Sequence, residues 1–278
     1  MMFIDEAYRY CRNKALKHYE NFPVATLLIP KKFRKHIYVV YSFARYADDI
    51  ADNPDLTEKE KIALLNECDE MLIEPGNDLI FCALNDTIKK FNLPLEEFKK
   101  LLKAFRQDVN RQKYETINEL LEYSSCSANP IGRILLKIYG IRNYESAEQY
   151  SDYICTALQL INFLQDVSVD LKFGRIYIPG ETIRKFGYSY ENLIAQNENV
   201  EYAALIKHLT DYTKELINKG KKLIGFVKGR FRYELKLIIK GGEMILKKIE
   251  SMEYKTLTRR PALSFFDKIN VLFFTIMK

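Results

Sequence analysis

Two pairs of aspartates have the spacing expected of metal-binding carboxylates. Asp48 and Asp52 are four residues apart in the sequence, and so are Asp166 and Asp170. On an α-helix this spacing places both acids on one face, where like charges repel by about a few tenths of a kcal/mol. A hard cation such as Mg²⁺ binds carboxylate oxygens and removes that repulsion. The spacing therefore predicts that each pair contributes ligands to a metal site.

Each pair belongs to a narrow polar stripe on a helix that is otherwise largely apolar. A solvated helix face is broad, whereas a narrow stripe indicates the polar lining of a cavity. Buried carboxylates are costly unless they are paired or bound to a metal. At about 100° per residue, the stripes comprise Tyr41, Arg45, Asp48 and Asp52 in one helix and Gln159, Asn162, Asp166 and Asp170 in the other.

A solvated acidic face with salt bridges inside the helix is the alternative explanation for either pair alone. Two matched stripes, one with an arginine and one with two amides, favour the metal site. Arg45 and Arg175 then have a purpose, because both can bind the oxygens of a phosphate group.

Helical periodicity recurs along the chain, and strand signals are weak. Thr57 and Glu60 form a capping box at the start of one helix. Glycine and proline fall mainly between the periodic segments. We therefore predict an all-α protein with one domain spanning residues 1–278 and about ten helices, including 57–73, 93–109, 117–125, 145–171, 199–224 and 234–252.

Composition narrows the class of protein. The 47% of apolar residues excludes global disorder, and the net charge of +6 is too mild to indicate nucleic-acid binding. The five cysteines have no metal or redox spacing, so we expect free thiols in a reducing cytosol. No segment is apolar over the roughly 18 residues that span a bilayer, and the opening residues lack the apolar core of a signal peptide.

The two acidic segments resemble the aspartate-rich motifs of the squalene/phytoene synthase family. They read "RYADDIAD" and "QLINFLQDVSVDLKFGRIYIP", and the resemblance extends over nearly the whole chain. It implies an isoprenoid-synthase-type helical bundle with a central apolar cavity. It also implies two or three Mg²⁺ ions between the motifs, which bind a prenyl diphosphate.

Further segments resemble the bacterial hydroxysqualene synthases of the hopanoid pathway, among them "AFRQDV", "SANPIGR" and "TRRPALS". That resemblance implies conversion of presqualene diphosphate to hydroxysqualene without NADPH. Three departures from the broader family agree with this resemblance, because each removes a side chain that the family uses to join two prenyl diphosphates. Glu20 replaces a lysine, Ser125 replaces a tyrosine, and Gln165 replaces an arginine.

The resemblance also assigns roles to individual residues. The metal ligands are Asp48, Asp52, Asn162, Asp166 and Asp170, and the diphosphate ligands are Arg45, Arg175 and Lys172. The aromatic groups that stabilise a cation are Phe22, Tyr41 and Phe163, and the candidates for orienting water are Asn21, Asn129, Gln159 and Gln165. His18 is also expected to bind the substrate. Gly174 and Pro179 predict a flap that brings Arg175 and Tyr177 over the diphosphate, and an ordinary helix-ending loop is the alternative.

The expected partner is a prenyl diphosphate lipid, received from a presqualene diphosphate synthase, and no nucleic acid. We expect a cytoplasmic protein that associates loosely with the inner face of the membrane. Synthesis of squalene, dehydrosqualene or presqualene diphosphate from farnesyl diphosphate is the main alternative. A terpene cyclase or a non-catalytic lipid-binding protein is a further alternative, although the latter needs no metal ligands.

Overall fold

The computed structural model describes residues 2–18, 29–110, 113–142, 144–264 and 267. It is 77% helical, and no strand occurs in the part of the chain that is described. The prediction of an all-α protein is confirmed. The described residues form twelve α-helices where about ten were expected, because α10 (Gly180–Lys185) and α11 (Tyr190–Ile194) are too short to show a clear periodicity.

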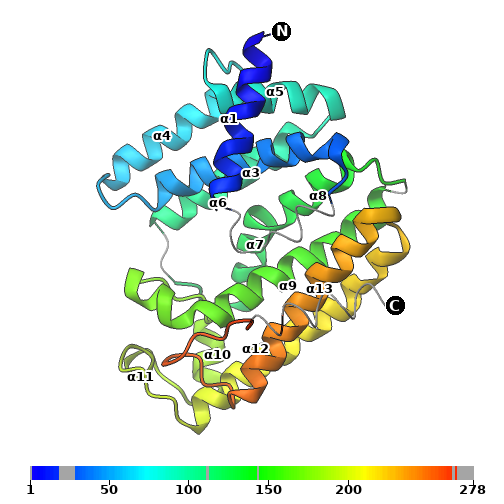
Figure 1. The fold of residues 1–278 in the computed structure, drawn as a ribbon. Helices are drawn as coiled ribbons and strands as arrows, with labels where there is room; N and C mark the ends of the chain where they lie inside the picture. Colours follow the sequence, from blue (N-terminus) through cyan, green and yellow to red (C-terminus); the bar gives the residue numbers. More distant parts are fainter. Residues whose placement is uncertain (1, 19–28, 111–112, 143, 265–266, 268–278) are drawn as a thin grey trace.

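The helices form two layers with a shorter pair between them (Figure 1). The upper layer contains α1 (Met2–His18), α3 (Lys31–Ala51), α4 (Glu58–Met71), α5 (Leu79–Phe91) and α6 (Leu95–Asn110). The intermediate pair is α7 (Ile117–Ser127) and α8 (Asn129–Ile138). The lower layer contains α9 (Tyr144–Asp170), α12 (Val200–Gly220) and α13 (Gly229–Ser251), with 3-10 turns η2 (Leu171–Phe173) and η3 (Lys221–Gly225).

Local sequence signals set several helix starts. Thr57 and Glu60 form the expected capping box, in which each side chain binds the other residue's backbone N–H. Asp78 caps α5 by accepting from two backbone N–H groups, and Thr116 caps α7 by accepting from one. These side chains satisfy donors that have no partner inside the helix.

The core consists of two clusters of buried side chains, one in each layer. Phe43 of α3 packs edge-on against Phe81 and Phe98 in the upper cluster. Helix α8 contributes Ile134 to the upper cluster and Leu136 to the lower one. Helix α6 likewise contributes Ala104 to the lower cluster and Leu101 to the upper one, so the two clusters are joined through helices that present apolar groups on both sides.

Helix α9 lies at the centre of the lower layer, and its neighbours approach it closely. A Cβ atom on Gly242 of α13 would lie 2.9 Å from Ile161 Cδ1, and one on Gly132 of α8 would clash with Ser151 Oγ. Any larger residue at either position would force these α9 side chains to move, so glycine allows the close approach. The position of the second acidic stripe depends on this packing.

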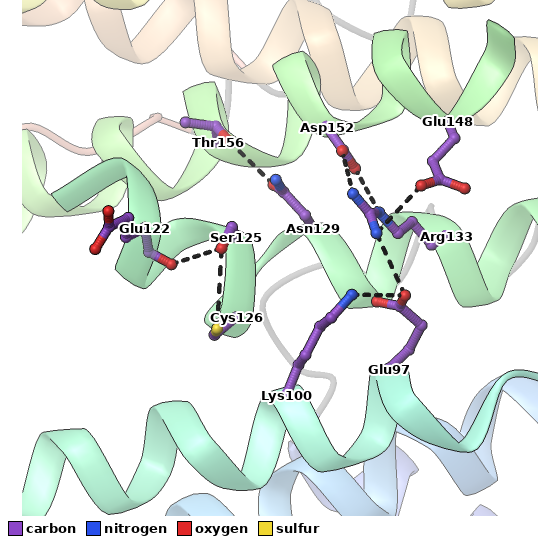
Figure 2. Close-up of polar contacts among 10 residues, drawn as sticks. All are labelled: Glu97, Lys100, Glu122, Ser125, Cys126, Asn129, Arg133, Glu148, Asp152 and Thr156. Carbon is purple, nitrogen blue, oxygen red and sulfur yellow. Dashed lines mark hydrogen bonds and ion pairs between the residues drawn. The ribbon is translucent and has the colours of Figure 1, made fainter. Parts of the chain in front are cut away.

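An ionic cluster joins α6, α8 and α9 (Figure 2). Arg133 donates to both carboxylate oxygens of Asp152, at 3.0 and 2.6 Å, and lies 3.1 Å from Glu148 and 3.3 Å from Glu97. Lys100 also donates to Glu97 at 3.0 Å. Because Glu97 is buried, it depends on these two cations for charge compensation.

All five cysteines are described, and none forms a disulfide, as expected. None of the described helices combines the length and the apolar character that crossing a bilayer requires.

Candidate active site

The first acidic stripe lies along α3 and ends at its C-terminus. Arg45 Nη1 donates to Asp48 at 2.9 Å, and Arg45 Nε lies 2.8 Å from Asp49. Asp52 caps the helix and is exposed. Tyr41 is half-buried one turn before Arg45, and burial raises its pKa. The four predicted residues of this stripe therefore follow one side of α3 from the interior to the helix end.

The second stripe lies along the last turns of α9. Asp166 accepts two bonds from Arg260, one from Nε and one from Nη2, the latter at 3.2 Å. Arg260 was not singled out from the sequence, where it occurs in the segment "TRRPALS" without helical periodicity. Asp170 is the last residue of α9 and is half-buried.

The segment 172–179, which we call the flap, connects the two stripes. Gly174 has a φ of +73°, which reverses the chain directly after η2. The backbone N–H of Arg175 then donates to the Asp170 carbonyl at 2.9 Å. Its side chain reaches Asp52, with 2.5 Å between Nη2 and Oδ1. The flap thus places an arginine from the second motif on an acid of the first.

The acids of the two stripes influence one another. Burial, reinforced by the charge of Asp52, raises the pKa of Asp48. Burial and the charges of Asp166 and Asp52 raise the pKa of Asp170 to about 7, against the opposing effect of Arg175. Because Arg175 binds Asp52 with its side chain and the Asp170 carbonyl with its backbone N–H, the ends of the two stripes lie close together.

Asp108 of α6 is a further acid at this site that sequence reasoning missed. Burial raises its pKa to about 7, and the Tyr123 hydroxyl donates to its Oδ2 at 2.9 Å. Its other oxygen is buried without a hydrogen-bond partner. Arg175, Asp52 and Asp48 all act on it electrostatically. A single acid in "AFRQDV" forms no spaced pair, so Asp108 is identified only in the structure, by its buried oxygen that has no hydrogen-bond partner.

Aromatic rings line the inner side of the flap. Tyr177 stacks on Phe163 of α9 with 3.9 Å between the ring centroids and 8° between the planes. Tyr114 stacks on the same tyrosine at 5.7 Å. Such rings stabilise a cation that lies over their faces.

A small apolar cavity lies beneath these rings, between α7, α9 and α12. Its volume is about 10 Å³, which is room for one water molecule. It is lined by Leu120, Leu160, Phe163, Leu164, Tyr177, Ile178, Leu209 and Thr213. A long lipid tail would therefore have to displace side chains to enter it. A larger groove of about 550 Å³ opens on α4 and α6, but its lining is mostly charged and does not suit a lipid tail.

The remaining predicted site residues have varied surroundings. Gln159 is half-buried, and Asn162 and Lys172 are exposed. Gln165 donates from Nε2 to the Pro261 carbonyl at 2.6 Å. His18 is the last residue of α1, and its side chain lies outside the described part of the structure, as do Glu20, Asn21 and Phe22.

Ser125 and Asn129 lie near the junction of α7 and α8 (Figure 2). Ser125 is exposed, and its hydroxyl donates to the Glu122 carbonyl within its own helix. Asn129 is buried, and its Oδ1 accepts from the Thr156 hydroxyl of α9 at 3.0 Å. Asn129 therefore has a fixed orientation, whereas Ser125 has the surroundings of a surface residue.

The donor set fits Mg²⁺, which prefers hard carboxylate oxygens. Excess negative charge and the unpartnered oxygen of Asp108 indicate a place where a cation would stabilise the protein. In the described part of the chain, no three acidic, histidine or cysteine side chains converge on a single point. The acids are bound by arginines in this arrangement, namely Asp48 by Arg45, Asp52 by Arg175 and Asp166 by Arg260.

Comparison with known proteins places this geometry in a family. The family model described as Squalene/phytoene synthase matches residues 15–267. A hydroxysqualene synthase of Sinorhizobium fredii is 33% identical over 244 residues, which cover 86% of this chain and 82% of that relative.

Solved structures share the fold. A squalene synthase of Alicyclobacillus acidocaldarius aligns with a TM-score of 0.86 and 33% identity, over 92% of this chain and 97% of that one. A dehydrosqualene synthase in complex with a ligand aligns with a TM-score of 0.88 and 23% identity, over 99% and 96% of the two chains. The expected isoprenoid-synthase-type fold is confirmed.

Proposed function

The chain belongs to the squalene/phytoene synthase family, and from that premise we propose that it converts presqualene diphosphate to hydroxysqualene in squalene or hopanoid biosynthesis. The family and its named members are prenyl-diphosphate-processing enzymes. The choice of reaction is supported by the 33% identity to a hydroxysqualene synthase. It is also supported by the replacements at Glu20, Ser125 and Gln165.

The observation that carries the proposal is the bond between Arg175 and Asp52. It brings the two aspartate stripes to one place, with an apolar cavity and stacked rings directly beneath the flap. A diphosphate needs cations, and a prenyl chain needs an apolar wall. Arg175 of the flap supplies a cation, and the stacked rings of Tyr177 and Phe163 supply an apolar wall at the same segment.

The arginines would bind the diphosphate oxygens. Arg45 and Arg175 each have a carboxylate partner in the structure, and either can exchange it for a phosphate oxygen when a cation takes the carboxylate. Mg²⁺ bound by the aspartates, with Asn162, would neutralise the charge that develops on the leaving diphosphate.

Loss of diphosphate breaks the C–O bond and leaves a cyclopropylcarbinyl cation, which opens to an allylic cation. The Phe163 ring would stabilise the positive charge through the face that is not stacked on Tyr177. Water adds to the allylic carbon and releases a proton, so the products are hydroxysqualene and diphosphate. No electrons are transferred, and the reaction therefore needs no NADPH.

The test incubates the purified protein and Mg²⁺ with presqualene diphosphate or with farnesyl diphosphate, in separate reactions, and identifies the lipids formed. We expect hydroxysqualene from presqualene diphosphate and little turnover of farnesyl diphosphate. Efficient turnover of farnesyl diphosphate alone would instead support the second candidate, a squalene-type synthase. That candidate is favoured by the 33% identity to the solved squalene synthase.

The lipid substrate also suggests where the protein works. We propose that it is cytoplasmic and associates loosely with the inner membrane surface, where a presqualene diphosphate synthase supplies the substrate. Phe173 of the flap is 71% exposed, and Ile194 of α11 is 68% exposed. The protein should co-sediment with anionic vesicles, and Phe173→Ser should lower the fraction of protein found in the vesicle pellet. Equal co-sedimentation of the unaltered protein and the variant would show that Phe173 does not contribute to membrane binding.

A further inference from the structure

The segment Thr256–Pro261, which we call the strap, follows α13 and turns back toward α9 (red in Figure 1). Its start is firmly held. The buried hydroxyls of Thr256 and Tyr202 are 2.6 Å apart. The Glu198 carboxylate accepts from the backbone N–H of Leu257 at 2.7 Å and from the Thr258 hydroxyl at 2.8 Å.

The far end of the strap is held by two adjacent residues of α9. Gln165 donates from its amide to the Pro261 carbonyl at 2.6 Å. Asp166 accepts both bonds from the Arg260 side chain. Gln165 therefore binds the backbone directly after Arg260, and Asp166 binds the Arg260 side chain itself.

The two contacts have different consequences for Arg260. An arginine side chain has several rotatable bonds, and it reaches a fixed place only if its backbone is fixed. The bonds to Glu198 fix the backbone before Arg260, and the bond from Gln165 fixes it after. Arg260 itself is exposed, so little packing of its own would hold it there.

We propose that Gln165 is a positioning residue, which fastens the strap and thereby holds Arg260 beside Asp166. In this role Gln165 acts on the site through Arg260 and does not touch the substrate. The side-chain amide of Gln165 is suited to this role because its NH₂ group can donate to the Pro261 carbonyl, which only accepts hydrogen bonds. Any anionic ligand at the second stripe would then depend on Gln165 for one of its cations.

The first experiment measures fastening directly by limited trypsin digestion of the metal-free protein. Trypsin cleaves after Arg259 only when the strap is locally released, because a protease needs several residues of unfolded chain. Gln165→Met keeps the length of the side chain and its neutral charge but removes the donor. We expect cleavage after Arg259 to be about 5- to 10-fold faster, by the loss of one hydrogen bond of about 1 kcal/mol or more.

Gln149→Met is the matched control, because Gln149 is an exposed glutamine on the same helix, 16 residues before Gln165. It should leave the cleavage rate unchanged. Thermal melting of each variant shows whether the rest of the fold is intact. An unchanged cleavage rate in Gln165→Met would overturn the proposal.

The second experiment measures binding of inorganic diphosphate with Mg²⁺ by calorimetry, and it rests on the proposed function. Gln165→Met should weaken binding about 3- to 10-fold, and Arg260→Gln should weaken it at least as much. The double variant should bind no more weakly than Arg260→Gln alone, because both changes remove one cation from the site. Additive losses would show that Gln165 meets the ligand itself, and the positioning role would be wrong.

The two experiments separate the inference from the proposed function. If the unaltered protein binds no diphosphate, the proposed function fails. The trypsin rates still decide whether Gln165 fastens the strap.

Discussion

The guanidinium of Arg175 lies 2.5 Å from the Asp52 carboxylate, although the two residues are 123 positions apart in the sequence. Asp52 ends α3, and Arg175 belongs to the flap that follows α9. The bond joins the upper and lower helical layers at the place where both acidic stripes end. Several expected outcomes depend on this junction and on the packing that supports it.

Removal of the Arg175 side chain should impair catalysis much more than folding. Arg175→Ala should lower kcat/KM for the prenyl diphosphate by about 100-fold, since the proposed function makes Arg175 a charged donor to the diphosphate. Steady-state kinetics with lipid extraction checks the value. Arg184→Ala is the control, because Arg184 also pairs with an acid, Glu115, but both are exposed. An effect below about 3-fold at Arg175 would contradict the assignment.

Asp108 should be needed for activity even though it belongs to neither stripe. Asp108→Asn keeps an acceptor for the Tyr123 hydroxyl but removes the charge. We expect kcat to fall by about 10-fold or more, as is typical when an electrostatic group is lost at a reacting centre. Asp69→Asn serves as the control, since Asp69 pairs with Arg106 in the groove on α4 and α6. Comparable kcat values for the two variants would count against a role for Asp108.

Neutralising Asp170 should stabilise the metal-free protein while abolishing activity. Asp170 is half-buried and repelled by Asp166 and Asp52, so Asp170→Asn relieves an unfavourable interaction. A gain of about 1 kcal/mol would raise the melting temperature by about 2 to 4 °C. Mg²⁺ should stabilise the unaltered protein by binding the folded state, and it should stabilise the variant less. A lower melting temperature for the metal-free variant would be the opposite result.

Arg133 should be important for stability, because three acids depend on it. Arg133→Met would leave Glu97, Glu148 and Asp152 without their shared cation. Breaking a buried ion pair from one side costs about 3 to 5 kcal/mol. We expect Arg133→Met to lower the free energy of unfolding by about 3 kcal/mol, at the low end of this range, because Arg133 is partly exposed. Urea denaturation followed by circular dichroism measures this loss, and a change below about 1 kcal/mol would show that the cluster is well solvated.

Glu234 should make stability depend on pH. Burial raises the pKa of Glu234 to about 7 from 4.5, although the bond from the Tyr139 hydroxyl opposes this shift. The folded protein therefore keeps a proton that the unfolded chain releases. The contribution of this proton to the free energy of unfolding is fully present below pH 4.5 and is lost as the pH rises to about 7. The loss is about 3 kcal/mol at most.

Glu234→Gln should remove this part of the pH dependence, because the amide does not titrate. Melting temperatures at pH 5 and pH 8 for both forms give the comparison. The unaltered protein should lose more stability between these values than the variant does. Equal losses would mean that folding does not raise the pKa of Glu234.

The sequence by itself determined the helices and the two acidic stripes. Helix α4 begins where its capping box predicts, because capping and periodicity depend on neighbours within a few residues. The stripe of Asp48 and Asp52 was likewise identifiable, since residues four apart share a helix face wherever the helix lies.

Only the tertiary structure decided which groups meet across these helices. Asp108 is a lone acid and Arg260 follows Arg259 in a segment without helical periodicity, so no spacing marks either residue, and their surroundings come from helices packed at long range. The amide of Gln165 has many acceptors within reach in principle, and the Pro261 carbonyl, 96 residues away, is the one that packing presents to it. Helix periodicity is a property of the local chain, whereas the partner of a polar group depends on how glycine contacts and buried side chains fix the distances between helices.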